Sequence, residues 1–157
     1  MASNKKLSTN VLEVPDDIEA VYEYLYERGA TDGLPIIPPT EDRVQKMIDY
    51  IGLAPDHVVA QVPMMYGEAT IEAIAVNAVM AGAKPEYMPV ITTAVEAVCD
   101  ERLNFFGWTS TNNSHGAAII VNGPVRKQIG LNSEFNALGP GWRANATIGR
   151  ALNFVTL

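Results

Sequence analysis

"GEATIEAIAVNAVMAG", residues 67–82, predicts the centre of the fold. Its apolar residues keep helical spacing, and nearly every position after Glu72 is small or apolar. A helix that is apolar all round is buried on most sides, so we expect other elements to pack around this one. Asn77 in its middle then needs a hydrogen-bond partner, because an unpaired buried amide costs about 1–3 kcal/mol. Glu68 and Glu72 precede the apolar part, where capping and the helix dipole favour acidic residues.

The rest of the chain predicts further helices around a few strands. Helical spacing and capping residues indicate helices over 15–30, 41–52, 84–101 and 142–157 and a helical turn over 125–130. Strand patterns occur at 57–63 and 103–108, and Ala117–Val121 reads as a buried strand. "DGLPIIPP", residues 32–39, is held extended by its prolines, and is either a stiff connector or a pocket wall with Asp32 at its mouth. We expect an α+β fold, with several helices packed on a small mixed β-sheet.

Length and composition indicate one globular domain of 157 residues, of which 48% are apolar and 18% charged. Residues 1–13 read as a flexible tail and residues 14–157 as a single domain. Residues 1–69 carry 12 acids and 5 bases, a net charge of −7, whereas residues 70–157 carry 6 of each, a net charge of 0. An acidic first half beside a neutral, apolar second half suggests that the second half is buried, with a partner as one means of burial.

Several function classes lack their sequence signature. The bases are scattered, so we expect no nucleic-acid binding. The N-terminus lacks a secretory signal and no run reaches 18 apolar residues, so we expect a soluble, cytoplasmic chain without a membrane segment. His57, Cys99 and His115 lie too far apart for a zinc motif, and phosphate-binding, dinucleotide and nucleophile-elbow motifs are absent. The sequence therefore predicts no metal site and names no cofactor.

His115 is the candidate for proton transfer, beside Ser114 in "TSTNNSHGAA", residues 109–118. Both side chains lie in a polar loop that leads into the predicted strand, a place where catalytic groups often occur. The alternative is a polar turn whose side chains satisfy backbone groups. Cys99 is a weaker candidate, because Asp100 and Glu101 beside it would raise the pKa of its thiol.

"LGPGWRANATIGRA", residues 138–151, is the candidate anion site. Gly139 and Gly141 would let the backbone approach a ligand, and the free N–H groups from Trp142 to Asn145 would donate to it. Helical spacing places Arg143 and Arg150 on a buried face, where each must pair with a carboxylate such as Glu134 or with an anionic ligand.

A second turn offers another anion site. "NGP", residues 122–124, follows the predicted strand, and the helical turn after Asn122 carries Arg126 and Lys127. These two cations either hold an anion or form a solvated basic turn.

Four stretches resemble a family of uncharacterised bacterial proteins found beside the selenocysteine- or cysteine-containing UGSC-motif proteins and sometimes labelled thioredoxin-like. They are "TDGLPIIPPTEDRV", "GEATIEAIAVNAVMAGAKPEYMPVI", "IIVNGPVRKQIGLNS" and "NALGPGWRANATIGRAL", which cover most of residues 31–152. The resemblance implies a partner with a reactive thiol or selenol, and redox or bond-cleaving chemistry on a small molecule. It also implies a chain that runs on past residue 157. The last helix has no stop signal, so it either continues in a longer chain or docks on another protein.

Two hypotheses follow from these patterns. In the first, the chain is a subunit, or the N-terminal part, of a heteromeric oxidoreductase or lyase. It would act on an anionic substrate by reductive cleavage, elimination or hydration, while a partner supplies the catalytic group. In the second, it is a non-catalytic assembly subunit whose "GPGWRAN" segment forms the subunit interface.

Overall fold

The computed structural model describes residues 7–63, 67–110 and 116–156. Within them the chain forms seven α-helices, two 3₁₀ helices and two strands. In chain order these are α1 (Ile18–Glu27), α2 (Glu41–Ile51), β1 (Val58–Val62), β2 (Gly67–Thr70), α3 (Ile71–Met80), η2 (Pro85–Tyr87), α4 (Met88–Val98), η3 (Glu101–Leu103), α5 (Phe105–Thr109), α6 (Val125–Gln128) and α7 (Arg143–Thr156). The α+β class is confirmed.

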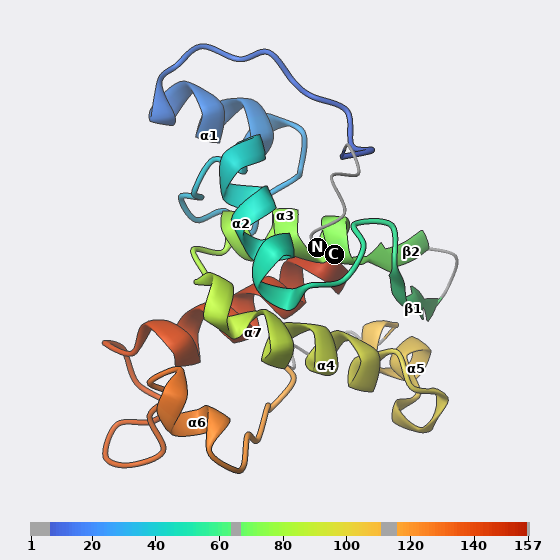
Figure 1. Ribbon diagram of the computed structural model, residues 1–157, viewed down its shortest axis with the longest axis vertical. Helices are drawn as coiled ribbons and strands as arrows, with labels where there is room; N and C mark the ends of the chain where they lie inside the picture. The colour runs from blue at the N-terminus through green and yellow to red at the C-terminus, as the bar shows by residue number, and fades with distance from the viewer. Residues whose placement is uncertain (1–6, 64–66, 111–115, 157) are drawn as a thin grey trace.

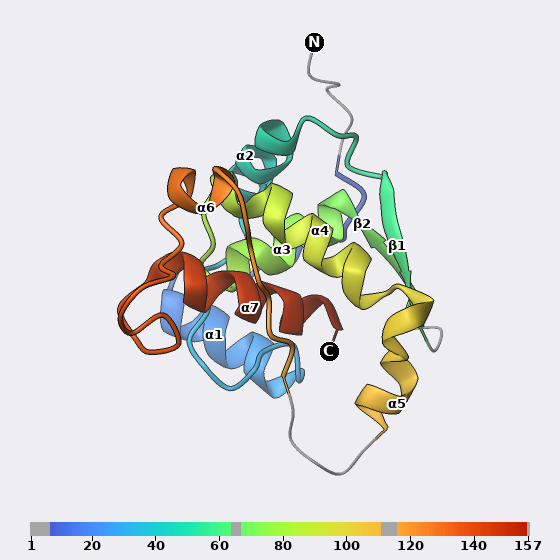
Figure 2. The same cartoon turned by 90° about the horizontal axis from the view of Figure 1, so that it is seen from below.

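Helix α3 lies at the centre and packs against α2, α4 and α7 (Figures 1 and 2). Its residues are buried on several faces, as the apolar sequence predicts: Ile71, Ile74, Ala75, Ala78, Val79 and Met80. Thr70 caps its first turn by accepting a hydrogen bond from the N–H of Ala73. The polar residue in the middle, Asn77, donates to the carbonyl of Ala73 at 3.0 Å, so its amide has a partner within the helix.

The sheet consists of β1 and β2, which pair antiparallel where a mixed sheet was expected. The four residues Gly67–Thr70, predicted as the start of the core helix, form β2 instead. Strand pairing with β1 satisfies the backbone of this segment up to the capping Thr70, from which the helix begins. Glu68 therefore lies in a strand, where it accepts a hydrogen bond from Gln61, and does not cap a helix.

Two other strand predictions are wrong. Phe105–Thr109, which overlaps the stretch 103–108, forms the short helix α5, because Asn104 caps its first turn by accepting from the N–H of Gly107. The residues Ala117–Val121 belong to no strand and are mostly exposed. Neither described strand pairs with this segment, so its apolar run alone does not make it a buried strand.

The carboxylate of Glu72 is buried in the first turn of α3, with a residue exposure of 1%. It accepts hydrogen bonds from the backbone N–H groups of Ser8 and Thr9 at 2.8–2.9 Å and from both of their hydroxyl groups. These bonds attach residues 8 and 9, in the segment expected to be a flexible tail, to the core helix. Burial raises the pKa of Glu72, but the bonds from Thr9 and Ser8 together outweigh it and hold the pKa below its ordinary value.

We expect Glu72→Gln to lower the free energy of unfolding by about 1–3 kcal/mol at neutral pH, because an amide group then faces four donors. A carboxylate with a lowered folded-state pKa stabilises the fold above its unfolded pKa and loses this effect as the pH falls. The difference in free energy of unfolding between the unmodified chain and the Glu72→Gln variant should therefore shrink below about pH 4.5. Urea unfolding at several pH values measures it, with Glu96→Gln on the exposed face of α4 as control. Equal stability of the two variants would contradict the role of Glu72.

Candidate functional site: the loop region before helix α7

Arg143 begins α7, yet its guanidinium lies at the carboxyl end of another helix. Its Nε donates to the carbonyl of Gly82 at 2.9 Å, just beyond the end of α3. A cation is favourable there, because the carboxyl end of a helix carries a partial negative charge. The residue is exposed, not buried as predicted, and it has no carboxylate within 4 Å in the described residues. The carboxyl end of α3, which the guanidinium of Arg143 reaches, thus explains why an arginine stands in the first turn of α7.

Arg150 is paired, but with Asp32 and not with Glu134. Its Nε and Nη2 donate to the two carboxylate oxygens of Asp32 at 2.7 and 2.8 Å, and Nη2 also donates to the carbonyls of Leu34 and Pro35. The side chains are only 20% and 24% exposed. The hydrogen bond from Arg150 is the main cause that lowers the pKa of Asp32. This ion pair fixes the proline-rich segment 32–39 on α7 and favours its interpretation as a connector.

Asn145 organises the loop that precedes α7. Its side chain accepts from the N–H of Asn132 at 2.9 Å and donates to the carbonyls of Asn132 and Ala137 at 2.8 and 3.0 Å. This side-chain amide therefore holds the loop over residues 131–142, while the anion binding predicted for the backbone N–H groups of residues 142–145 stays a prediction. Asn136 adds a second tie by donating to the carbonyl of Pro140 at 2.9 Å.

Gly139 is required by this packing. A Cβ there would lie 1.7 Å from Oδ1 of Asn136, so any larger residue would displace that side chain and break its bond to Pro140. Gly141 and Trp142 follow in the exposed part of the loop, and the Trp142 side chain contributes apolar surface there. Gly139 and Asn145 thus have contacts within the loop, and the anion site predicted for this segment stays a prediction.

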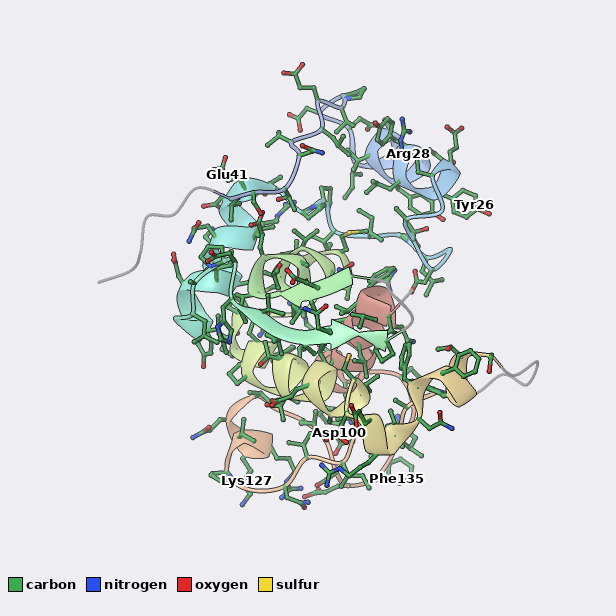
Figure 3. All side chains as sticks on the ribbon, turned by 90° about the vertical axis from the view of Figure 1, so that its right-hand side faces the viewer. Tyr26, Arg28, Glu41, Asp100, Lys127 and Phe135 are labelled. Atoms are coloured by element: carbon green, nitrogen blue, oxygen red, sulfur yellow. The ribbon has the colours of Figure 1, made fainter. Side chains whose placement is uncertain are left out.

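Asn122 lies in an open hollow of about 590 Å³, which we call the basic hollow. Its polar lining consists of Asn122, Arg126, Lys127 and Ser133. Helix α6 contributes the two cations, and Figure 3 shows Lys127 and Phe135 at the end of the molecule opposite Tyr26 of α1. Ser133 follows Asn132, so the bonds of Asn145 also hold this wall of the hollow.

The predicted catalytic pair, Ser114 and His115, lies outside the described residues, so its role stays a prediction. Cys99 is half-buried, and burial raises the pKa of its thiol, so the reactive thiolate is disfavoured. Residues 7–63, 67–110 and 116–156 contain no group of three or more potential metal ligands. Among the helices of this same part of the chain, none has the length and hydropathy of a bilayer-spanning segment.

Sequence reasoning did not include Ser133 among the site residues. For Arg126 and Lys127 the sequence left two alternatives, an anion site and a solvated basic turn, and the structure places both residues in the lining of the hollow. Only the fold of the loop brings residue 133 opposite residues 120–127. The sequence contained one indication of a positively charged region, an excess of bases over acids after residue 102: four bases against one acid.

We expect Arg143→Ala to lower the free energy of unfolding by about 1 kcal/mol, because the carbonyl of Gly82 then loses its donor. Thermal unfolding measures the effect, and Lys46→Ala, which removes an exposed pair with Asp42, is the matched control. Unchanged stability of Arg143→Ala would contradict this structural role and favour the predicted role in anion binding.

We expect a double-mutant cycle of Asp32→Asn and Arg150→Ala to give a coupling energy of about 1–3 kcal/mol, because the pair is bidentate and mostly buried. The same cycle on Asp42 and Lys46, whose side chains are 75% and 64% exposed, should give at most about 0.5 kcal/mol. Asp32 has a lowered pKa, so its contribution to the stability of the fold is complete at neutral pH. This contribution declines as the pH falls and the carboxylate is protonated. Equal coupling in the two cycles would contradict the structural importance of the pair.

The chain was compared with family models, curated proteins and solved structures. No family model, no curated protein and no solved structure matches the chain.

Proposed function

We propose that this chain is one subunit of a multi-subunit enzyme that acts on a small anionic molecule. A partner chain docks on the loop before α7 and supplies the reactive group, which the sequence resemblance suggests is a thiol or selenol. The reaction classes that fit an enzyme with these two kinds of subunit are reductive cleavage, elimination and hydration.

The observation that carries the proposal is an apolar surface on a loop with fixed geometry. The side chains of Ile120, Phe135 and Leu138, which we call the loop face, are 85%, 94% and 105% exposed. Hydrogen bonds of Asn132, Asn136 and Asn145 hold the backbone of this loop. Large apolar residues exposed to this extent lose their contact with water when a partner covers them. Burying each of them would contribute about 1.5–3 kcal/mol.

The charge distribution indicates what kind of surface would fit. Residues 1–102 hold 7 bases and 17 acids, a net charge of −10, whereas residues 103–157 hold 4 bases and 1 acid, a net charge of +3. The loop face lies in the positive part, beside Arg126 and Lys127. The proposed partner therefore presents an apolar surface with an excess of carboxylates around it, which steers association and fixes register.

The chemical groups of the described residues also agree with a reactive group that is supplied by a partner. In the described residues, Cys99 is half-buried with a raised thiol pKa, and no cluster of three or more potential metal ligands is present. Proton transfer by His115 with Ser114 remains part of the proposal as a prediction from the sequence. The reactive group would then come from the partner.

A second candidate is a non-catalytic assembly subunit, which the same loop face supports. The two candidates differ in what the partner does by itself. If this chain binds substrate, the purified partner without it should lack turnover. If this chain only assembles the complex, the partner alone should retain turnover.

We expect Phe135→Ser/Leu138→Ser to weaken binding of the partner by about 100-fold or more, since two buried apolar side chains are lost. The experiment purifies the complex from its native host, identifies the partner by mass spectrometry and then measures its binding to each purified variant by calorimetry. Circular dichroism checks that the variants remain folded.

The matched control is Ile18→Ser/Tyr26→Ser, which removes two exposed apolar side chains from α1 at the other end of the molecule (Figure 3). This control should bind as the unmodified chain does. A chain that purifies alone, or a control that weakens binding as much as the loop-face variant, would overturn the proposal.

A further inference from the structure

We propose that the basic hollow binds the anionic group of a small organic molecule, a carboxylate or a phosphate attached to a short apolar body. The inference deepens the proposed function, on which it rests for its biological meaning, because it names the class of substrate and the place where it binds. It assigns Arg126, Lys127 and Ser133 a role in binding, together with Asn122.

The first argument is that the polar side chains that line the hollow form no hydrogen bond or ion pair within the described residues. Within the described residues, neither Arg126 nor Lys127 forms an ion pair, and no hydrogen bond engages the side chain of Asn122 or Ser133. The asparagines of the neighbouring loop differ, since Asn132, Asn136 and Asn145 all hold backbone groups. Two cations, an amide and a hydroxyl therefore belong to the lining of one hollow and have no partner within the described part of the protein.

The second argument is electrostatic. Glu134 is the one acid between residues 103 and 157, and it is exposed and absent from the lining of the hollow. The adjacent charges of Arg126 and Lys127 on the single turn of α6 repel each other, and an anion between them relieves this repulsion. Arg126 is the half-buried one of the two, so its bond to an anion is less screened by solvent.

The third argument is that the walls are held before a ligand arrives. On one side, Asn145 binds both backbone groups of Asn132, which fixes the position of Ser133. On the other side, the carbonyl of Pro124 accepts from the N–H groups of Lys127 and Gln128, which closes the turn of α6. A site with fixed walls binds with less loss of conformational entropy than a mobile surface.

The shape and the apolar lining select the body of the ligand. Ile120, Val121 and Pro124 line the hollow beside the polar groups. Its volume of about 590 Å³ is within the range of roughly 300–1,000 Å³ that small-molecule sites occupy. The hollow is open, so one part of the ligand stays accessible to a partner that docks on the loop face. Carboxylate and phosphate share the needed chemistry, since both accept paired hydrogen bonds from arginine.

Contacts within the protein favour the hollow over the start of α7 as the place for the anion. Nε of Arg143 donates to the carbonyl of Gly82, and the side-chain amide of Asn145 is bonded within the loop. The hollow has the same type of side chains without internal partners.

The experiment titrates the purified chain, without any partner, with hexanoate, hexyl phosphate, inorganic phosphate and the neutral hexanol, and follows backbone amides by ¹H–¹⁵N NMR at low ionic strength. We expect both amphiphilic anions to shift the amides of residues 120–133, and hexanol to bind about tenfold more weakly than either. The better of the two anions identifies the charged group. Inorganic phosphate should bind more weakly than hexyl phosphate, because it leaves the apolar lining exposed.

Arg126→Gln/Lys127→Gln should raise the dissociation constant of both amphiphilic anions about tenfold or more. The matched control, Arg28→Gln/Lys46→Gln, makes the same change of charge on α1 and α2 and should bind as the unmodified chain does. Equal loss in the control, equal binding of hexanol, or shifts that avoid residues 120–133 would each overturn the inference. Because the titration needs no partner and no turnover, its failure would leave the docking proposal standing, and loss of docking would leave the anion site standing.

Discussion

The constraint on which the structure depends is that α3 has to be covered on almost every side. Its sequence offers apolar or small residues all round, so α2, α4 and α7 pack against it. Its two ends impose further demands. At the amino end, the buried carboxylate of Glu72 is satisfied by Ser8 and Thr9, which fixes the start of the described chain. At the carboxyl end, the carbonyl of Gly82 accepts from Arg143. Segments far apart in the sequence are thereby brought to one helix.

The two arginines of α7 connect this core to the proline-rich segment and to α3. Arg150 pairs with Asp32 and binds two carbonyls of the same segment, so residues 32–35 cannot leave α7 without loss of four hydrogen bonds. Nε of Arg143 and the guanidinium of Arg150 donate to groups of the protein, whereas Arg126 and Lys127 of α6 form no ion pair within the described residues.

The loop before α7 has two surfaces with different properties. Its backbone is held by asparagines, and on this rigid support the loop face exposes apolar side chains while the basic hollow exposes unpaired polar ones. If a partner covers the loop face, it also approaches the mouth of the hollow, and the ligand would lie near the contact between the two chains. In this proposal the partner supplies the reactive group and the hollow binds the anionic group of the substrate.

The sequence by itself determined the α+β class, the positions of the long helices and the burial of α3, because hydrophobic spacing and capping residues are local signals. It also identified the chemically interesting loops. Only the tertiary structure decided that Gly67–Thr70 pairs as a strand, that Ala117–Val121 does not, and that the partner of Arg150 is Asp32, 118 residues away. Strand formation requires a neighbour and charge pairing requires proximity, and neither is encoded in the spacing of a single segment. For the same reason only the structure showed that Arg143 donates to the carbonyl of Gly82 and that Arg126 and Lys127 line one hollow with Ser133.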